Sequence, residues 1–357
     1  MIEFPFGPGH PGSGNFSLRI AAEGERVVKA RSCPGYLHRG FEKLMEYRTP
    51  MQNSVLSDRL CVLGPLGWNL LHAEAVEKLR GVQIPKRVQY IRVIMAELSR
   101  IQSHMIWFSV MSMALGYHTG FNIVVGYRDY ILDIFEMITG GRVYPAGYIC
   151  PGGVRRDFPD GVGEKISKVL DQIDGLARKL ENPVFEARLR GVGVLELDDA
   201  IALGATGPVL RASGFEADVR KQEPYEAYDE LDFDIPTEED GDAYARFSVG
   251  LSEMEQSARI IKQALQKMPD EEIEPVKPKP VDRIPEGEVY VRNEIARGEG
   301  AVYMVGDGTD RPYRCKIRGP SLCHLIPILE HLLPGHEVAD IPAIYWSLNG
   351  CPADMDR

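Results

Sequence analysis

Two cysteines stand in short segments that could hold a metal or carry out thiol chemistry. Cys61 lies in DRLCVLGPLGWN, residues 58–69, and Cys351 lies in NGCPADMDR near the C-terminal end. Each could open a C-x-x-C pair, the spacing of thiolate ligands for zinc and iron–sulfur clusters, but Gly64 and Asp354 occupy the second positions. The residues leave open an altered metal site or two unrelated thiols, since a lone cysteine is usually a small buried hydrophobe.

Composition excludes several classes of protein. The net charge of −11 argues against a nucleic-acid-binding surface. The six cysteines form no C-x-x-C pair and no disulfide framework, so we expect a cytoplasmic protein with no metal or cluster signature of its own. No signal peptide is evident, and the most apolar stretch, residues 105–116, is shorter than the roughly 20 residues that span a bilayer. Any work at a membrane is therefore expected to be done through partners.

Other candidate residues have ordinary explanations when taken singly. His10 lies in the glycine-rich turn GPGH and would usually be a loop histidine. Glu97, Arg100 and His104 fall at i, i+3 and i+7 of a predicted helix, where the residues alone favour an ion pair and a histidine on a solvated face over a redox-linked histidine. No phosphate-binding glycine motif and no serine-hydrolase or zinc-protease signature is present.

The elements that must position these residues are mainly helical, with small β elements at both ends. A hairpin is predicted within residues 16–30, long helices over residues 85–116 and 122–143, and further helices near 162–182 and 243–268. Two strands, EVYVRNEI and GAVYMVGDG, and a short helix, SLCHLIPILEHLL, are predicted near the C-terminal end. The expected fold class is α+β.

The expected organisation is one integrated domain made of four segments. Residues 1–36 form an N-terminal β segment, residues 37–267 the helical bundle core, and residues 289–357 a C-terminal α+β segment that closes a cavity. Residues 268–288 are rich in proline and charge, which is typical of a linker or an extended arm.

Seven segments, in this order along the chain, resemble the 49-kDa (D) subunit of respiratory complex I, which is related to the large subunit of group 4 membrane-bound nickel–iron hydrogenases. They are FGPGHP, GYLHRGFEK, YIRVIMAELSRIQSH, TGGRVYPAGYICPGGVRRDFP, GATGPVLRASG, ADVRKQEPYEAYDELDFDIP and GDGTDRPYRCKIRGPS. The resemblance covers essentially the whole chain, and several segments are long and irregular. It implies a hydrogenase large-subunit-like helical bundle with an N-terminal hairpin and a C-terminal α/β segment.

The resemblance also implies partners and a source of electrons. The chain would dock onto a small iron–sulfur (B-like) subunit, whose terminal 4Fe–4S cluster delivers electrons into a cavity between the two chains. It would bind no cofactor itself. A 30-kDa (C-like) subunit, a membrane H-like subunit and antiporter-like subunits would hold it peripherally at the cytoplasmic side of the membrane. Family positions that flank the cluster match Arg59 and His104, where a cation stabilises the reduced cluster and a histidine couples electron arrival to proton uptake.

Departures from the family pattern argue against two familiar activities. Hydrogenases hold nickel and iron with four cysteines, and here Gly64 and Asp354 replace the second cysteine of each pair, so no metal is expected. Quinone-reducing relatives carry a second histidine, a tyrosine and an aspartate at positions that are Gly14, Val62 and Ala114 in this chain. None of these three side chains can donate a proton to a quinone.

Three functions remain open. The leading hypothesis is an electron-transfer subunit of a membrane-bound, ion-translocating complex I-like oxidoreductase, similar to archaeal membrane-bound sulfane-sulfur reductases. Its acceptor cavity would be formed at Gly14, Val62 and Gly64, and the catalytic residues would be Cys61, Cys351, Asp354 and His10. The alternatives are the D subunit of a quinone or methanophenazine reductase, with a reshaped pocket, and a non-catalytic scaffold that couples redox change to ion pumping.

Overall fold

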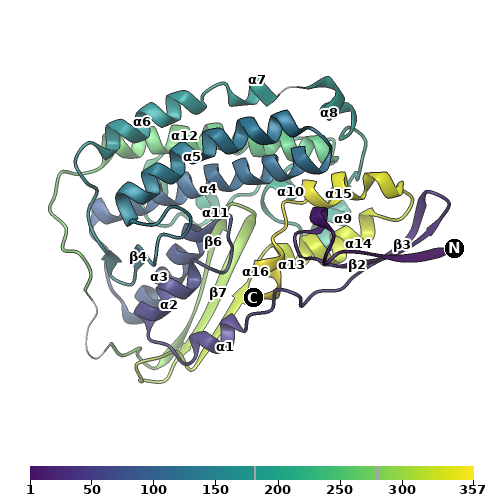
Figure 1. The fold of residues 1–357 in the computed structure, drawn as a ribbon. Helices are drawn as coiled ribbons and strands as arrows, with labels where there is room; N and C mark the ends of the chain where they lie inside the picture. The colour runs from purple at the N-terminus through teal and green to yellow at the C-terminus, as the bar shows by residue number, and fades with distance from the viewer. Residues whose placement is uncertain (181, 278–281) are drawn as a thin grey trace.

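A bundle of long helices forms the larger part of the protein, of which a computed structural model describes residues 1–180, 182–277 and 282–357 (Figure 1). The central helix, α4 (Lys86–Ala114), packs against α5 (His118–Thr139), α12 (Ala243–Lys267), α3 (Pro65–Arg80) and α15 (Ile341–Ser347). Most of α4 is buried, because apolar side chains surround it on nearly every side. This confirms the predicted α+β class with a central bundle helix.

Shorter helices connect the bundle to its surroundings. They are α1 (Phe41–Met45), α2 (Pro50–Ser57), α6 (Val162–Ile173), α7 (Leu176–Leu180), α8 (Pro183–Ala187), α9 (Leu197–Ala202), α10 (Gly207–Arg211), α11 (Val219–Gln222), α13 (Ser321–Cys323), α14 (Leu329–Leu332) and α16 (Pro352–Asp356). Single turns η1 (Pro11–Ser13), η2 (Tyr228–Glu230), η3 (His324–Ile328) and η4 (Val338–Asp340) complete the set. None of the helices formed by the described residues is both long and apolar enough to cross a bilayer.

Within the described ranges, three small antiparallel sheets flank the bundle. The N-terminal sheet has the order β1 (Ile2–Phe6), β2 (Leu18–Glu23), β3 (Arg26–Ser32), and its β2–β3 hairpin was predicted. A two-stranded ribbon pairs β4 (Ile149–Cys150) with β5 (Gly153–Val154). The C-terminal sheet has the order β6 (Gly287–Ile295), β7 (Gly298–Gly306), β8 (Arg314–Arg318) and packs against α3. Strand β8 was not predicted; the sequence analysis placed only two strands in this region.

The predicted linker lies partly outside the described residues. Residues 268–277 and 282–286 contain no helix or strand, residues 287–288 belong to strand β6, and residues 278–281 fall outside. The division into four segments stays a prediction. A second apolar cluster, separate from the bundle core, lies between α3 and the β6–β8 sheet and contains both Cys61 and Cys351.

The helix face that carries Glu97 is buried, which corrects the sequence-based preference for a solvated face. Glu97 has no exposed surface and accepts hydrogen bonds from Tyr228 Oη and Ser257 Oγ, each at 2.6 Å. Burial opposes ionisation, but Arg100 and Arg220 outweigh it and lower the pKa of Glu97 to about 2. Both guanidiniums lie 3.1 Å from its carboxylate oxygens.

This pair belongs to a larger buried ion network. Arg220 also bonds Asp218 at 2.6 Å, and Arg211 bonds Glu294 at 2.9 Å as well as Glu253. These residues come from α10, α11, α12, β6 and the turn before α11. Together with Glu97 and Arg100, these residues are named the bundle ion network here. The network joins the helical bundle to the C-terminal sheet.

We predict that Glu97→Ala lowers the free energy of unfolding by about 3–5 kcal/mol, because it leaves two buried guanidiniums without their shared carboxylate. Denaturant unfolding measures this loss. Because the pKa of Glu97 is depressed, the difference from wild type should be constant above about pH 5 and shrink as the pH falls from about 4 to about 2.

The matched control for this prediction is Asp171→Ala, which removes the exposed partner of Lys262 on the bundle surface. Exposed ion pairs contribute little, so this variant should unfold close to wild type. Equal stability of the two variants would contradict a structural role for the bundle ion network.

Candidate functional site

The loop that carries Cys61 is fixed at both ends by helix signals in the sequence. Helix α2 begins with a capping box, in which Thr49 and Gln52 exchange side-chain-to-backbone hydrogen bonds, and α3 begins at Pro65. Between them, Asp58 Oδ2 accepts a 2.6 Å hydrogen bond from the amide of Gly147. The loop is thereby tied to the segment that follows α5.

The segment that carries Cys351 is fixed by a tight turn after α15. Asn349 adopts a left-handed backbone with φ +49°, and Gly350 follows where a Cβ would lie 2.4 Å from the side chain of Leu325. The amide of Cys351 then donates to Ser321 Oγ at 2.9 Å, and Pro352 begins α16. Only glycine fits at position 350 with the chain so close to α13–α14.

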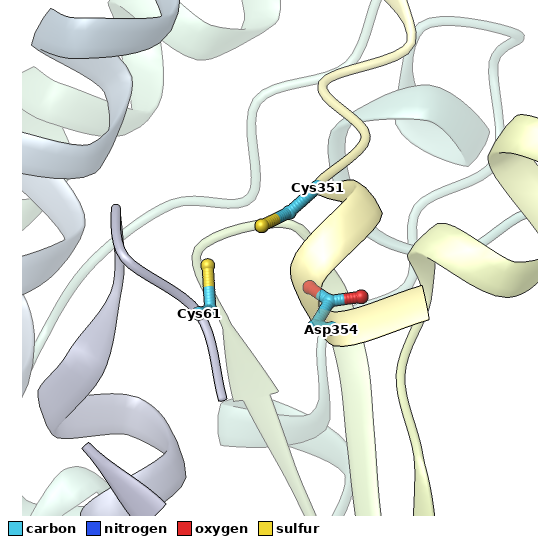
Figure 2. Close-up of side chains that lie close together, drawn as sticks. All are labelled: Cys61, Cys351 and Asp354. Carbon is cyan, nitrogen blue, oxygen red and sulfur yellow. The ribbon is translucent and has the colours of Figure 1, made fainter. Parts of the chain in front are cut away.

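The structure brings Cys61, Cys351 and Asp354 together although 290 residues separate the two cysteines. Their sulfur and carboxylate oxygen atoms all lie within 4.8 Å of one another, and all three residues are buried. Figure 2 shows the two sulfur atoms facing each other, with the carboxylate of Asp354 projecting from α16 beside them. Both cysteines are free thiols. The sequence left open whether the two cysteines meet; the structure brings them together with Asp354, and the catalytic role of the three residues stays a prediction.

A buried arginine completes the cluster. Arg297 stands at the tip of the two-residue turn between β6 and β7, and its Nη1 donates to Ser103 Oγ at 3.0 Å. Its Nε and Nη2 have no hydrogen-bond partner among the described residues. Burial lowers the pKa of this guanidinium, but Cys61, Cys351 and Asp354 outweigh it and raise the pKa. The three acidic groups therefore share one buried cation.

The two thiols differ in acidity. Burial raises the pKa of Cys61, but the neighbouring Cys351 thiol, which can share its hydrogen, and Arg297 lower it to about 7. The Cys61 side chain and then burial raise the pKa of Cys351 well above the usual range. Around neutral pH a substantial share of Cys61 is therefore thiolate, whereas Cys351 remains a thiol.

Asp354 is a neutral or weakly ionised acid in this setting. Burial and then the charge of Cys351 raise the pKa of Asp354 to about 8. Neither carboxylate oxygen meets a hydrogen-bond partner by distance and angle, although the Ser321 hydroxyl lies near enough to oppose the rise. The carboxyl group can thus hold a proton beside the two sulfur atoms.

These residues do not fit a nickel–iron centre. A Cβ at Gly64 would lie 3.7 Å from Arg297 Nη1 and from Ser103 Oγ, so the position has room for a side chain but supplies no donor atom. Two sulfur atoms and one carboxylate replace the four thiolates that such a centre requires, and a buried guanidinium faces them. The donor set is that of a thiol pair.

An exposed, positively charged face borders the thiols. Arg39 donates to the carbonyls of Leu60 at 3.2 Å and Ala353 at 2.8 Å, so it joins the two cysteine segments. The guanidinium of Arg59 is exposed and lies 4.9 Å from the ring centroid of Tyr144, which is half-buried. Of the two residues predicted to flank a partner's cluster, Arg59 is accessible from outside this chain.

The second predicted cluster neighbour, His104, lies inside the bundle. It has no exposed surface, and its Nε2 lies 2.8 Å from Glu253 Oε2. Burial, despite Glu253, lowers the pKa of His104, so the ring is neutral. A fully enclosed histidine cannot contact a group held by another subunit in this arrangement. The place of His104 beside a cluster therefore stays a prediction, and the group in contact with Arg59 in this chain is Tyr144.

Three further predicted residues lie away from the thiols or offer little space. His10 is exposed, and its contacts are local: its Nδ1 accepts from the Gly12 amide at 3.1 Å and its ring packs against Phe6. Gly14 has φ +57°, and a Cβ there would lie 3.3 Å from Trp346. Val62 is 38% exposed. Gly14 thus leaves little room for a side chain, whereas Gly64 borders the thiol site, and the acceptor cavity stays a prediction.

Arg297, Ser103, Arg39 and Tyr144 are the residues that sequence reasoning missed. Arginine at a two-residue hairpin turn is ordinarily solvent-exposed, so NEIARGEG gave no sign that Arg297 is buried. Ser103 and Tyr144 could have been noticed, since they belong to segments that carry the family resemblance, SRIQSH and TGGRVYPAG.

Comparisons with known proteins agree with the geometry. The profile of the family described as "Respiratory-chain NADH dehydrogenase, 49 Kd subunit" matches residues 114–357, and that of "Nickel-dependent hydrogenase" matches residues 39–118, which include Cys61. The D subunit of the NADH-quinone oxidoreductase of Thermosipho melanesiensis is 43% identical, with 100% of this chain and 99% of the relative covered. The D subunit of the F(420)H(2) dehydrogenase of Methanosarcina mazei is 42% identical over 98% of this chain and 96% of the relative.

A solved structure also matches throughout. A chain from the membrane-bound sulfane sulfur reductase (MBS), an archaeal respiratory membrane complex, superposes with a TM-score of 0.95 at 40% identity, covering 100% of this chain and 98% of that one. The predicted resemblance and fold are confirmed. The chain belongs to the family of the respiratory-chain NADH dehydrogenase 49-kDa (D) subunit, which is found in complex I-like oxidoreductases.

Proposed function

We propose that this chain is the acceptor-site subunit of a membrane-bound, ion-translocating oxidoreductase, and that it reduces sulfane sulfur, such as polysulfide, at Cys61 and Cys351. The observation that carries the proposal is a buried thiol pair whose pKa values are driven in opposite directions by shared surroundings. Such a pair provides a nucleophilic thiolate and a thiol that resolves the product. The 40% identical chain from a sulfane sulfur reductase supports the substrate class.

The first two steps need only these two cysteines and the substrate. The Cys61 thiolate attacks the terminal sulfur of a polysulfide dianion, and the bond to the next sulfur breaks, which gives a persulfide on Cys61 and a polysulfide dianion one sulfur shorter. The Cys351 thiol then attacks the Cys61 sulfur. A Cys61–Cys351 disulfide forms, and the terminal sulfur leaves with the Cys351 proton as HS⁻.

Reduction of the disulfide restores the pair. Two electrons, delivered one at a time from the 4Fe–4S cluster of a partner iron–sulfur subunit, and one proton return Cys61 to the thiolate and Cys351 to the thiol. The exposed Arg39 and Arg59, with the half-buried Tyr144, form the face on which that subunit would dock. The remaining proposed partners are C-like, membrane H-like and antiporter-like subunits.

Arg297 would act as a positioning residue in this chemistry. Its buried charge keeps Cys61 ionised, and its unpartnered Nε and Nη2 hydrogens can receive the negative charge of a bound persulfide or polysulfide. Asp354 can hold a proton close to the leaving sulfur. Both groups favour an anionic sulfur substrate.

The site geometry, and not similarity alone, supports the proposal of sulfur over quinone reduction. The relatives named for quinone, F(420)H(2) and sulfane sulfur are about equally similar, at 43%, 42% and 40% identity. At Gly14 the φ of +57° disfavours a side chain and a Cβ would lie 3.3 Å from Trp346, and Val62 and Ala114 carry no proton donor. A quinone would therefore find none of the hydrogen-bond donors that its reduction uses in the family.

We predict that Arg297→Met raises the pKa of Cys61 from about 7 toward the ordinary thiol value of about 8.5, because the thiolate loses its buried counter-charge. The pH dependence of Cys61 modification by a small uncharged haloacetamide, quantified by peptide mass spectrometry, measures the midpoint. Arg297→Lys keeps the charge and should retain a midpoint near that of wild type. An unchanged midpoint in Arg297→Met would remove Arg297 from the mechanism.

We predict that Cys61→Ser in the assembled complex lowers polysulfide-dependent HS⁻ release by at least about two orders of magnitude, since the nucleophile is lost. Cys351→Ser should stop the cycle one step later, which leaves Cys61 heavier by one sulfur atom in peptide mass spectrometry.

Cys33→Ser is the matched control, because Cys33 is half-exposed and its sulfur contacts only the Arg31 carbonyl, at 3.9 Å. It should keep full activity. Full HS⁻ release by the Cys61→Ser variant would contradict the proposed function. In that event, activity that responds to quinone-site inhibitors favours the quinone hypothesis, and no acceptor activity favours the scaffold.

A further inference from the structure

A second group of buried acids lies outside the thiol site, where α3 meets β6. Glu74 and Glu77 of α3 and Glu226 approach Arg92, whose Nη1 bonds Glu226 at 2.7 Å and Glu77 at 3.0 Å. The Glu226 side chain is 4% exposed, and its Oε2 has no partner by distance and angle among the described residues. Glu74 is half-buried; its Oε2 accepts from Asn293 Nδ2 at 2.7 Å, and its buried Oε1 has no such partner.

One guanidinium cannot neutralise three buried carboxylates. Burial and then Glu226 raise the pKa of Glu74 well above the usual range, and burial raises the pKa of Glu226 despite Arg92. Lys78 and Arg292 are the other cations along this surface. Glu74 and Glu226, close enough to share a hydrogen, can therefore retain a proton between them at neutral pH.

The Glu74–Glu226 carboxyl pair lines a groove on the protein surface. A surface groove of about 400 Å³ is lined by Glu74, Glu226, Tyr225 and Asn293, among others, so protons from solvent reach the pair.

The same region opens inward toward the thiols. A small cavity of about 10 Å³ shares Tyr225 and Asn293 with the groove and extends to Gly64, three residues after Cys61, and to Ala296 beside Arg297. That volume holds about one water molecule.

Two buried polar atoms point to such a water. Ser99 and Asn293 are each 2% exposed, line the small cavity, and leave Ser99 Oγ and Asn293 Oδ1 without a hydrogen-bond partner among the described residues. A buried water satisfies orphaned polar atoms of this kind. Arg100 also lines the cavity, but its charge is balanced by Glu97 at 3.1 Å.

We propose that Glu74 and Glu226 are the proton-transfer residues of this chain, which take protons from the surface groove and pass them, through one water held by Asn293 and Ser99, to the thiol site. The proposal rests on the proposed dithiol chemistry, in which one proton per cycle must reach Cys351 after the disulfide accepts two electrons. The steps that form the disulfide consume no outside proton. Loss of the proton relay should therefore slow the reduction of the Cys61–Cys351 disulfide but not its formation.

The test uses the assembled complex with Glu74→Gln, and Ser99→Ala as a second variant. Glu74→Gln should slow reductant-driven HS⁻ release at least about tenfold. It should leave unchanged the rate at which the reduced complex forms the Cys61–Cys351 disulfide with polysulfide, followed by acid quench and mass spectrometry. Infrared difference spectroscopy should show a protonated-carboxyl band in wild type that is lost in Glu74→Gln.

Glu223→Gln is the matched control, because Glu223 lies at the same groove but is paired with the surface residue Arg292. It should behave as wild type. Wild-type rates in both Glu74→Gln and Ser99→Ala would overturn the relay while leaving the dithiol chemistry standing. Failure of the wild-type complex to form the Cys61–Cys351 disulfide would instead overturn the proposed function on which the relay rests.

Discussion

The thiol site depends on the bundle ion network, because that network holds strand β6. The turn after β6 carries Arg297, the only buried counter-charge identified for the site among the described residues. Arg100 of α4 donates to the carbonyls of Glu294 at 2.6 Å and Ile295 at 3.0 Å, the last two residues of β6. The turn that follows places Arg297 against the cysteines. Without the carboxylate of Glu97 opposite it, Arg100 would be an uncompensated buried charge and could not anchor that strand. The proposed redox chemistry at the junction of sheet and bundle would thus depend on electrostatics inside the bundle.

The charge balance at the thiols then follows from the replacement of two further thiolates by Gly64 and Asp354. One guanidinium can compensate one buried anion, and the structure meets this limit by ionising Cys61 while Cys351 and Asp354 keep their protons. Additional thiolates, as in a nickel–iron centre, would need the charge of a metal to offset them. Glycine at position 64 and aspartate at position 354 remove that need, and they leave a site whose stable form is one thiolate beside one thiol.

The sequence could predict the segments but not the burial that decides their chemistry. Helical periodicity located α4 and α12, and the alternation of side chains around a turn located the β2–β3 hairpin. The spacing of Cys61 to Gly64 and of Cys351 to Asp354 identified the altered site. The convergence of chain segments about 290 residues apart is a tertiary property that no local pattern encodes. Glu97 and His104 have the spacing of a solvated face, and the packing of α12 against α4 turns that face inward. Arg297 was missed for the same reason, since its hairpin tip is covered by other elements.

Enclosure of the thiols has a consequence for proton supply. Cys61 is 1% exposed and Cys351 6%, so bulk water does not reach the sulfur atoms freely in this arrangement. Electrons can tunnel into an enclosed site from a docked partner, but a proton must move along hydrogen-bonded groups. The side occupied by Arg59 and Arg39 repels protons by its positive charge and is also the face on which an electron donor would dock. The acids at the α3–β6 junction lie at a different opening and carry the opposite charge. Separate entry of electrons and protons is the arrangement that an ion-translocating complex requires, because it ties each electron transfer to a proton that arrives from a defined direction.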